Sequence, residues 1–210
     1  MTASGAPHLS LPRLDTRTRA VALLLHGGAE VGTEPVARWA GPPLRMVPFG
    51  WSIRRHARNV GVARMRYRRR GWNGAAADPL ADVEYALTQI DRRRPGLPVV
   101  LVGHSMGGRA AILAAGDPQV VGLVALAPWI HRDDPVDQLA GKDVAVLHGT
   151  DDHRTSPEGS ARFAATIGAI ARSVEYVSIP GGDHAMLRHA ATWHRSTADA
   201  VAAMTDRLRP

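Results

Sequence analysis

The 210-residue sequence predicts an α/β fold, with a mostly parallel central sheet of about six or seven strands and helices on both of its faces. Two observations predict this class. Short, nearly continuous apolar runs recur along the chain, as in strands that are buried on both faces of a parallel sheet. Longer segments with apolar residues at helical spacing lie between these runs. Because the two patterns alternate to the end of the chain, helical crossovers should join the strands.

The predicted strands are six apolar runs rich in valine, leucine and alanine. They lie at Ala20–Leu25, Gly61–Arg66, Pro98–Val102, Val120–Ala125, Val144–Leu147 and Val174–Ile179. The segment before them, residues 1–19, is interrupted by Pro7 and Pro12, so we expect a tail or one edge strand there. Residues 20–210 then form a single domain, which suits a chain of this length.

Helices are predicted between and after these runs. Asp78 and Ser156 each precede a proline, which predicts an N-cap followed by a proline in the first turn. The apolar faces of these two helices are Leu80, Val83, Leu87 and Ile90, and Phe163, Ala164, Ile167 and Ala171. The last helix follows His184, with a predicted stripe at Leu187, Ala191, His194, Ala198, Val201 and Leu208.

Composition excludes several classes of function. The chain has no cysteine, which excludes disulfides, a thiol nucleophile and Cys-ligated metals. Its net charge is +7, and Lys142 is the only lysine among 26 basic residues. Such a charge fits either an anion-binding surface or an arginine-biased composition. Because the arginines are scattered and accompany no zinc-finger or RNP motif, we favour the second and expect no nucleic-acid partner.

The sequence shows no signal for secretion or for a membrane. The first ten residues lack the basic start and apolar run of a secretory signal. The longest apolar stretches, Ala20–Leu25 and Val120–Ile130, are far shorter than the roughly 20 residues that a membrane-spanning helix needs. We therefore expect a cytoplasmic protein that does not act on a membrane.

The strongest functional signal is Gly103-His104-Ser105-Met106-Gly107, a G-x-S-x-G motif. It follows an apolar strand and precedes a helix of small residues at 109–115, the context that the motif requires. A nucleophilic serine must project from a sharp, strained turn, and glycines on both sides let the neighbouring backbone pack closely. Ser105 is therefore the predicted nucleophile.

A second signal is His26-Gly27-Gly28, directly after the first predicted strand. Acyl transfer builds an oxyanion, which two backbone N–H donors must already face. One donor is expected from Met106, the residue after the nucleophile. Gly28 is the main candidate for the other and Ala29 the alternative, although an ordinary turn between strand and helix has the same sequence pattern.

Two further signals follow the last two predicted strands. Residues 148–152 read His-Gly-Thr-Asp-Asp, and either Asp151 or Asp152 could orient a catalytic imidazole and stabilise its charged form. Both lie at the carboxyl end of a strand, where ligands bind in open α/β sheets. His184 follows two glycines after the final strand, so a flexible loop could carry its imidazole to Ser105. His189 is expected on the surface or in the core of the last helix.

The chain order serine, aspartate, histidine resembles that of the α/β-hydrolase superfamily, over roughly Val21 to Leu208. The sequence looks most like small lidless members, similar to dienelactone hydrolases and esterases. In similar hydrolases the acid is the fourth residue of a G-x-x-D pattern, which selects Asp152 over Asp151. The resemblance implies an α/β-hydrolase fold without a cap domain, because residues 127–142 are too few to form one.

The resemblance implies a serine hydrolase that cleaves a carboxylic ester or related acyl bond through an acyl-enzyme, with no cofactor. A thioesterase, a peptidase or another reaction on the same scaffold remains an alternative, as does a binding protein without catalysis. The expected partner is a small acyl substrate, and the expected state is a monomer or homodimer. No metal site is expected, since His184, His189 and His194 are spaced by five residues and face different sides of a helix.

Three residues are candidates for substrate binding. Arg70 and Trp72 follow the second predicted strand, at the sheet edge where the catalytic residues are expected. Arg70 could bind an anionic group and Trp72 could form an apolar wall. Trp129 is a similar candidate for the acyl pocket. The alternative is a solvated loop with Trp72 packed beneath it.

Overall fold

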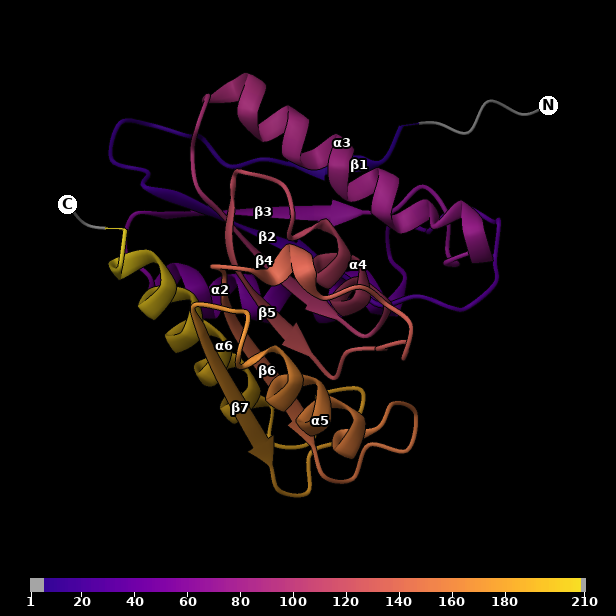
Figure 1. Ribbon diagram of the computed structural model, residues 1–210. Helices are drawn as coiled ribbons and strands as arrows, with labels where there is room; N and C mark the ends of the chain where they lie inside the picture. Colours follow the sequence, from indigo (N-terminus) through magenta and orange to yellow (C-terminus); the bar gives the residue numbers. More distant parts are fainter. Residues whose placement is uncertain (1–5, 209–210) are drawn as a thin grey trace.

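The computed structural model describes residues 6–208. The first five residues of the predicted tail and the last two of the chain lie outside the described residues. Seven strands form one sheet (Figure 1). They are β1 (His8–Ser10), β2 (Ala20–Leu25), β3 (Val60–Arg66), β4 (Val99–His104), β5 (Val120–Leu126), β6 (Asp143–Gly149) and β7 (Ser173–Ile179).

The strand order is β1-β3-β2-β4-β5-β6-β7. Every neighbouring pair is parallel except β1 and β3, where His8 lies opposite Arg66 in antiparallel register. Every residue of β2, β4 and β6 is buried, which explains why these strands read as continuous apolar runs. The predicted α/β class with a mostly parallel sheet is therefore confirmed, and all six predicted strands are present.

The connections between strands create a crevice at one edge of the sheet. From β2 the chain moves to β3 on one side and then returns to β4 on the other side of β2. Such a reversal leaves space outside the carboxyl ends of the two strands, where ligands bind in open α/β folds. Residues 26–28 follow β2 and Ser105 follows β4, so the topology brings both to this crevice.

Helices cover both faces of the sheet. They are α1 (Gly41–Arg45), α2 (Val47–His56), α3 (Asp78–Arg93), α4 (Met106–Ala114), α5 (Pro157–Ile167) and α6 (Ala190–Asp206), with 3-10 turns at Gly74–Ala76 and Asp137–Leu139. Helices α3, α4 and α5 pack on one face, and α2 and α6 pack on the other (Figure 1).

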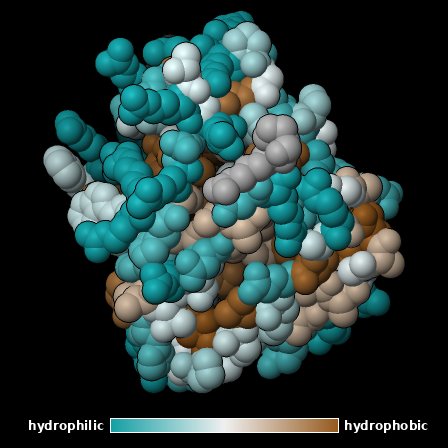
Figure 2. All heavy atoms as spheres, turned by 90° about the vertical axis from the view of Figure 1, so that its left-hand side faces the viewer, coloured by the Kyte–Doolittle hydropathy of each residue, from teal (hydrophilic) through white to brown (hydrophobic). Residues whose placement is uncertain are grey.

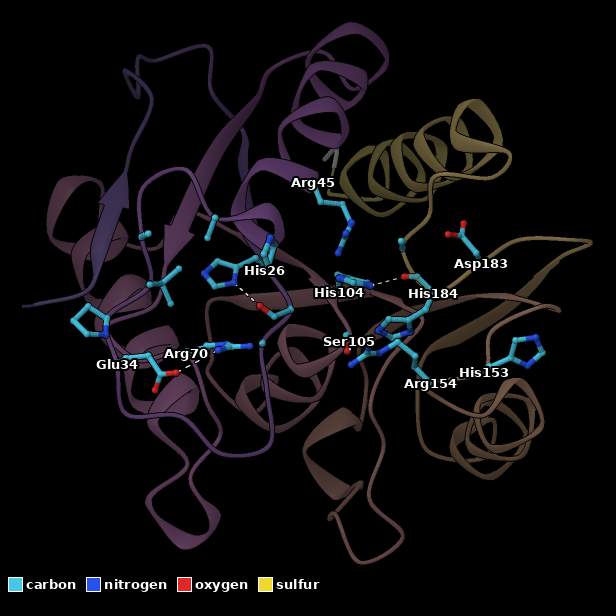
Figure 3. Close-up of a pocket in the computed structure, with 18 of the residues that line it drawn as sticks. His26, Glu34, Arg45, Arg70, His104, Ser105, His153, Arg154, Asp183 and His184 are labelled. Carbon is cyan, nitrogen blue, oxygen red and sulfur yellow. Dashed lines mark hydrogen bonds and ion pairs between the residues drawn. The ribbon is translucent and has the colours of Figure 1, made fainter.

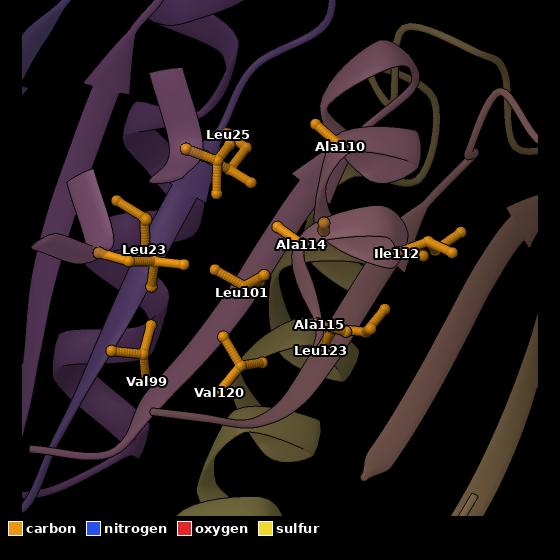
Figure 4. Packing of buried hydrophobic residues seen from close by; sticks show 14 of the residues in the cluster. Leu23, Leu25, Val99, Leu101, Ala110, Ile112, Ala114, Ala115, Val120 and Leu123 are labelled. Carbon is orange, nitrogen blue, oxygen red and sulfur yellow. The ribbon is translucent and has the colours of Figure 1, made fainter. Parts of the chain in front are cut away.

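The core between the sheet and α4 holds the nucleophile turn in place. Leu25 of β2, Leu101 of β4 and Leu123 of β5 are fully buried and face α4 (Figure 4). Ala110 and Ala114 of that helix are small, so its backbone can pack close to the strands. The start of α4 is thereby fixed against the carboxyl ends of β2 and β4.

Helices α1 and α2 are absent from the sequence-based prediction. Prolines at Pro43 and Pro48 interrupt the apolar pattern there, but both lie in the first turn of a helix, where the missing N–H group is not needed. In α2 only Phe49, Gly50 and Ile53 are buried, so the apolar face is too short to stand out.

The two predicted N-caps have different outcomes. Ser156 caps α5 as predicted, since its hydroxyl accepts the N–H of Gly159 at 2.9 Å. The prediction for Asp78 is wrong. The cap of α3 is Ala77 in a left-handed conformation with φ of 42°, and the Asp78 carboxylate instead accepts from Asn73 Nδ2 at 2.8 Å.

The predicted stripe of α6 is wrong at its beginning. The helix begins at Ala190, and Leu187, which precedes it, is 70% exposed. Ala191 is also exposed. Trp193 is fully buried and anchors a stripe that is shifted from the predicted one. The buried residues of α6 are Trp193, Thr197, Ala198, Ala200, Val201, Met204 and Thr205.

The surface and the connections leave the crevice uncovered. Within residues 6–208 no cap domain is present, and the connection after β5 contains only a 3-10 turn.

Seen from the left of Figure 1, the molecule is mostly hydrophilic, with hydrophobic residues in patches between polar ones (Figure 2). Among the described residues, no helix combines the length and apolar character that crossing a lipid bilayer requires.

Candidate active site

The turn between β4 and α4 projects the hydroxyl of Ser105 into the crevice. Ser105 has φ of 54° and ψ of −115°, a strained conformation for a residue with a side chain. A Cβ atom on Gly107 would collide with the backbone carbonyls of Leu25 and His26. The turn therefore packs directly on the end of β2, as the spacing of glycines in the sequence predicts.

Three predicted residues form one hydrogen-bonded chain. The Ser105 hydroxyl lies 3.1 Å from Nε2 of His184, and His184 Nδ1 lies 2.7 Å from Oδ2 of Asp152. In the tautomer that satisfies both contacts, Nδ1–H donates to the carboxylate and Nε2 accepts from the hydroxyl. Asp152 is buried, whereas Ser105 and His184 are partly accessible.

Asp152, and not Asp151, contacts His184. The Asp151 carboxylate lies at the surface and pairs with Arg188 at 2.8 Å. Burial raises the pKa of Asp152. Hydrogen bonds from His148 and His184, and from the backbone N–H groups that follow Asp152, outweigh burial and hold this pKa well below the usual range. The chain thus ends on a carboxylate that stays ionised at neutral pH.

A second histidine, which is fully buried, also contacts this carboxylate. His148 Nε2 lies 3.1 Å from Oδ2 of Asp152, and its Nδ1 lies 2.7 Å from the hydroxyl of Ser160. Thr155 adds its hydroxyl to the same oxygen at 2.8 Å. All these partners fix the carboxylate plane, so Asp152 cannot rotate away from His184.

Backbone N–H groups also face the crevice beside Ser105. Met106 is the first residue of α4, so its N–H has no carbonyl partner one turn earlier in the helix. The Ala29 N–H donates to the Arg70 carbonyl at 3.0 Å, whereas the Gly28 N–H has no partner among residues 6–208. A Cβ atom on Gly28 would collide with the Arg70 carbonyl and with the end of the Met106 side chain, so this position has room only for glycine.

A cavity of about 820 Å³ opens beside Ser105 and His184 (Figure 3). Its volume suits a small organic molecule. The lining includes backbone and side chains from the loops after β2, β4, β6 and β7 and from α1. The polar and charged lining residues are His26, Glu34, Arg45, Arg70, His104, Ser105, Asp151, His153, Arg154, Asp183 and His184.

All three acids of this lining are already engaged by other groups. Glu34 pairs with Arg70 at 3.3 Å, and Asp151 pairs with Arg188 at 2.8 Å. Asp183 accepts two backbone N–H groups at 3.0 and 2.8 Å. Two of the three acids are therefore paired with arginines, and Asp183 is held by backbone N–H groups.

Two buried histidines border the site in the neutral form. Burial, helped by the charges of His184 and Arg45, lowers the pKa of His104 to about 3, and its Nε2 donates to the His184 carbonyl at 2.9 Å. Burial also lowers the pKa of His26 to about 4. Its Nδ1 donates to the Gly27 carbonyl at 2.6 Å. Both rings brace loops of the site and carry no charge at neutral pH.

The structure separates the three substrate-binding candidates. Arg70 lines the cavity, but Trp72 and Trp129 do not. Trp72 is 5% exposed and belongs to the core, and Trp129 packs edge-on against it at 6.1 Å. The Arg109 guanidinium lies over both rings, 4.4 and 4.7 Å from their centroids.

Several site residues are missing from the sequence-based prediction. His104 and His148 stand inside the motifs around Ser105 and Asp152, so their positions at strand ends were a usable signal. Arg45 and Arg154 reach the cavity from segments with no functional motif of their own. Within residues 6–208, no three His, Asp or Glu side chains are arranged to hold a metal ion.

A family model described as serine aminopeptidase, S33, matches residues 59–144, which run from β3 into β6 and include the Ser105 turn. No curated protein has a matching sequence. Solved structures resemble the whole chain at low identity.

Est1E from Butyrivibrio proteoclasticus, solved with ferulic acid bound, has a TM-score of 0.70 at 15% identity, over 94% of each chain. A serine hydrolase without a lid from Xanthomonas campestris has a TM-score of 0.65 at 18% identity, over 93% of this chain and 87% of its own. A monoacylglycerol lipase from Paleococcus ferrophilus has a TM-score of 0.66 at 15% identity, over 95% and 100%. The chain therefore has the α/β-hydrolase fold, and the family match includes the turn that carries Ser105.

Proposed function

We propose that this protein is a serine hydrolase that cleaves carboxylic esters through a triad of Ser105, His184 and Asp152. The observation that carries the proposal is the hydrogen-bonded chain from the Ser105 hydroxyl to the Asp152 carboxylate, with contacts of 3.1 and 2.7 Å, at an open cavity. Serine is a weak nucleophile by itself, and an adjacent base oriented by a carboxylate activates it.

The first half of the reaction forms an acyl-enzyme. His184 Nε2 takes the hydroxyl proton as the Ser105 oxygen attacks the ester carbonyl. The imidazolium then gives that proton to the departing alkoxide, which leaves as an alcohol. Asp152 stays ionised and stabilises the imidazolium.

The second half consumes one water molecule. His184 takes a proton from the water, whose oxygen attacks the acyl carbonyl, and the same proton returns to the oxygen of Ser105. The net change is ester plus water to carboxylic acid plus alcohol.

Backbone N–H groups of Met106 and Gly28 are the proposed oxyanion donors. Both developing oxyanions form beside Ser105, where preorganised donors stabilise charge most effectively. The free N–H of Gly28 supports its assignment, since the alternative donor, Ala29, is bonded to the Arg70 carbonyl.

An ester substrate fits the cavity better than the amino-terminal peptide that the family description suggests. Aminopeptidases must receive a free ammonium group, for which an available carboxylate is the natural partner. Glu34 and Asp151 are already in ion pairs with arginines, and Asp183 accepts two backbone N–H groups. Among the structural neighbours, one binds ferulic acid, a carboxylic acid, and another is a monoacylglycerol lipase, which also supports ester chemistry.

Replacement of the nucleophile tests the proposal. Ser105→Ala should lower the rate of p-nitrophenyl ester hydrolysis by roughly 10⁴-fold or more while the protein stays folded, because no other group can form the acyl-enzyme. Wild-type protein, but not this variant, should be labelled by a fluorophosphonate. Undiminished hydrolysis in the folded variant would contradict the assignment.

A further inference from the structure

The cavity beside Ser105 contains two cationic side chains without partners. Arg70 is paired with Glu34, but the guanidinium groups of Arg45 and Arg154 form no hydrogen bond or ion pair with any residue of the described range 6–208. None of the three acids of the lining pairs with either arginine, since Glu34 and Asp151 bind other arginines and Asp183 accepts backbone N–H groups. The lining holds three arginines and three acids, so a place for an anion exists only where these two unpaired guanidinium groups lie.

Both arginines are placed close to the reacting groups. Arg45 is half-buried at the end of α1, and its charge acts on His104, which bonds to the His184 carbonyl. The backbone N–H of Arg154 donates to Asp152 Oδ1 at 2.7 Å, which ties this residue to the triad acid. In Figure 3 the two side chains extend from opposite sides toward the region of Ser105.

A guanidinium keeps its charge at any physiological pH and binds carboxylates or phosphates through paired N–H groups. At the half-buried Arg45 such contacts are less screened than on an open surface, whereas Arg154 is exposed. We propose that Arg45 and Arg154 form an anion-binding subsite, so that the substrate is an ester that also carries a separate anionic oxygen group, a carboxylate or a phosphate. This inference rests on the proposed hydrolysis at Ser105.

Matched esters test the subsite. The substrates are p-nitrophenyl hexanoate, the mono-p-nitrophenyl ester of hexanedioic acid and its analogue with a terminal phosphonate in place of the carboxylate. The proteins are wild type, Arg45→Gln, Arg154→Gln and Arg92→Gln. Arg92 is an exposed residue of α3 outside the cavity, so its variant controls for the loss of one charge.

We expect wild type to have a higher kcat/KM on at least one anionic ester than on the hexanoate. Whichever of the carboxylate and phosphonate esters has the higher kcat/KM identifies the anionic group. Each cavity variant should lose roughly tenfold in kcat/KM on that ester, mainly through a higher KM, and less than about twofold on hexanoate. Arg92→Gln should change neither value. The inference is overturned if wild type shows no preference, or if the cavity variants lose activity equally on neutral and anionic esters.

Binding to the Ser105→Ala variant separates this inference from the proposed hydrolysis. Calorimetry with hexanedioate and with a phosphonohexanoate should show saturable binding that Arg45→Gln or Arg154→Gln weakens about tenfold. Binding without turnover of any ester by wild type would refute the hydrolase and keep the anion subsite. Ser105-dependent turnover of hexanoate without anion binding would refute the subsite and keep the hydrolase.

Discussion

The Asp152 carboxylate accepts hydrogen bonds at both of its oxygens. Oδ2 is shared by His184 at 2.7 Å, His148 at 3.1 Å and Thr155 at 2.8 Å. Oδ1 accepts two backbone N–H groups, at 2.7 and 3.0 Å. These bonds hold the pKa of Asp152 low and its plane fixed, so it can orient the imidazole of His184 without taking up a proton.

A pair of conservative substitutions tests which aspartate is the acid. Asp152→Asn should lower kcat/KM on a p-nitrophenyl ester by roughly 10³–10⁴-fold, because an amide favours the wrong imidazole tautomer. Asp151→Asn should change it by less than about twofold, since Asp151 pairs with Arg188 at the surface. Steady-state kinetics of both variants provides the measurement, and the reverse ranking would move the acid by one residue.

The β4–α4 unit shows how one turn depends on the neighbouring strand. The turn holds Ser105 at positive φ, and the first turn of α4 packs on the carbonyls that end β2. Glycine at position 107 is required by this close approach of two backbones. The same contact affects the distance between the proposed oxyanion donors, because Met106 begins α4 and Gly28 lies in the loop after β2.

Adding one methyl group at this contact should disturb the unit. Gly107→Ala should lower the free energy of unfolding by about 1–3 kcal/mol, since the new Cβ meets backbone atoms that cannot rotate away. It should also lower kcat, because the donors separate. Gly41→Ala is the control, as a Cβ there meets nothing within 4 Å, and its stability should change by no more than about 0.5 kcal/mol. If Gly107→Ala and wild type had equal free energies of unfolding in urea, the packing argument would be contradicted.

At the scale of the whole molecule, folding buries histidines in their neutral form. His26 and His104 lie at the carboxyl edge of the sheet with pKa values of about 4 and about 3, below the ordinary value of 6.5. Below about pH 6.5 the unfolded chain therefore binds more protons than the folded chain, and stability must fall as the pH falls. The pKa of Asp152 is also lowered by folding. Its contribution to the free energy of unfolding is lost only when the pH falls below the ordinary aspartate pKa of 3.8.

Urea unfolding at several pH values tests this linkage. Between about pH 6 and 5, the free energy of unfolding should fall by up to about 1.4 kcal/mol per pH unit for each of the two histidines. His104→Gln should reduce that slope by about one histidine's share, whatever its effect on stability at neutral pH. His153→Gln is the control, since His153 is exposed. A slope that His104→Gln leaves unchanged would contradict the buried neutral form.

Local patterns were sufficient for much of this protein. Each buried strand needs an apolar run, and most of the parallel crossovers carry a helix, so the six strands and the α/β class can be read along the chain. The turn around Ser105 is likewise local, because its glycines and its place between strand and helix are requirements of a short segment. The N-cap at Ser156 is local for the same reason.

Contacts between distant segments decided the rest. The G-x-x-D pattern favours Asp152 over Asp151 by resemblance, but its contact with His184 forms only because β6 meets the loop after β7. Arg109 of α4 covers Trp72 and Trp129, which no local pattern reveals. The cavity and its free arginines form where loops from opposite halves of the sheet come together, so their chemistry depends on three-dimensional packing and not on sequence spacing.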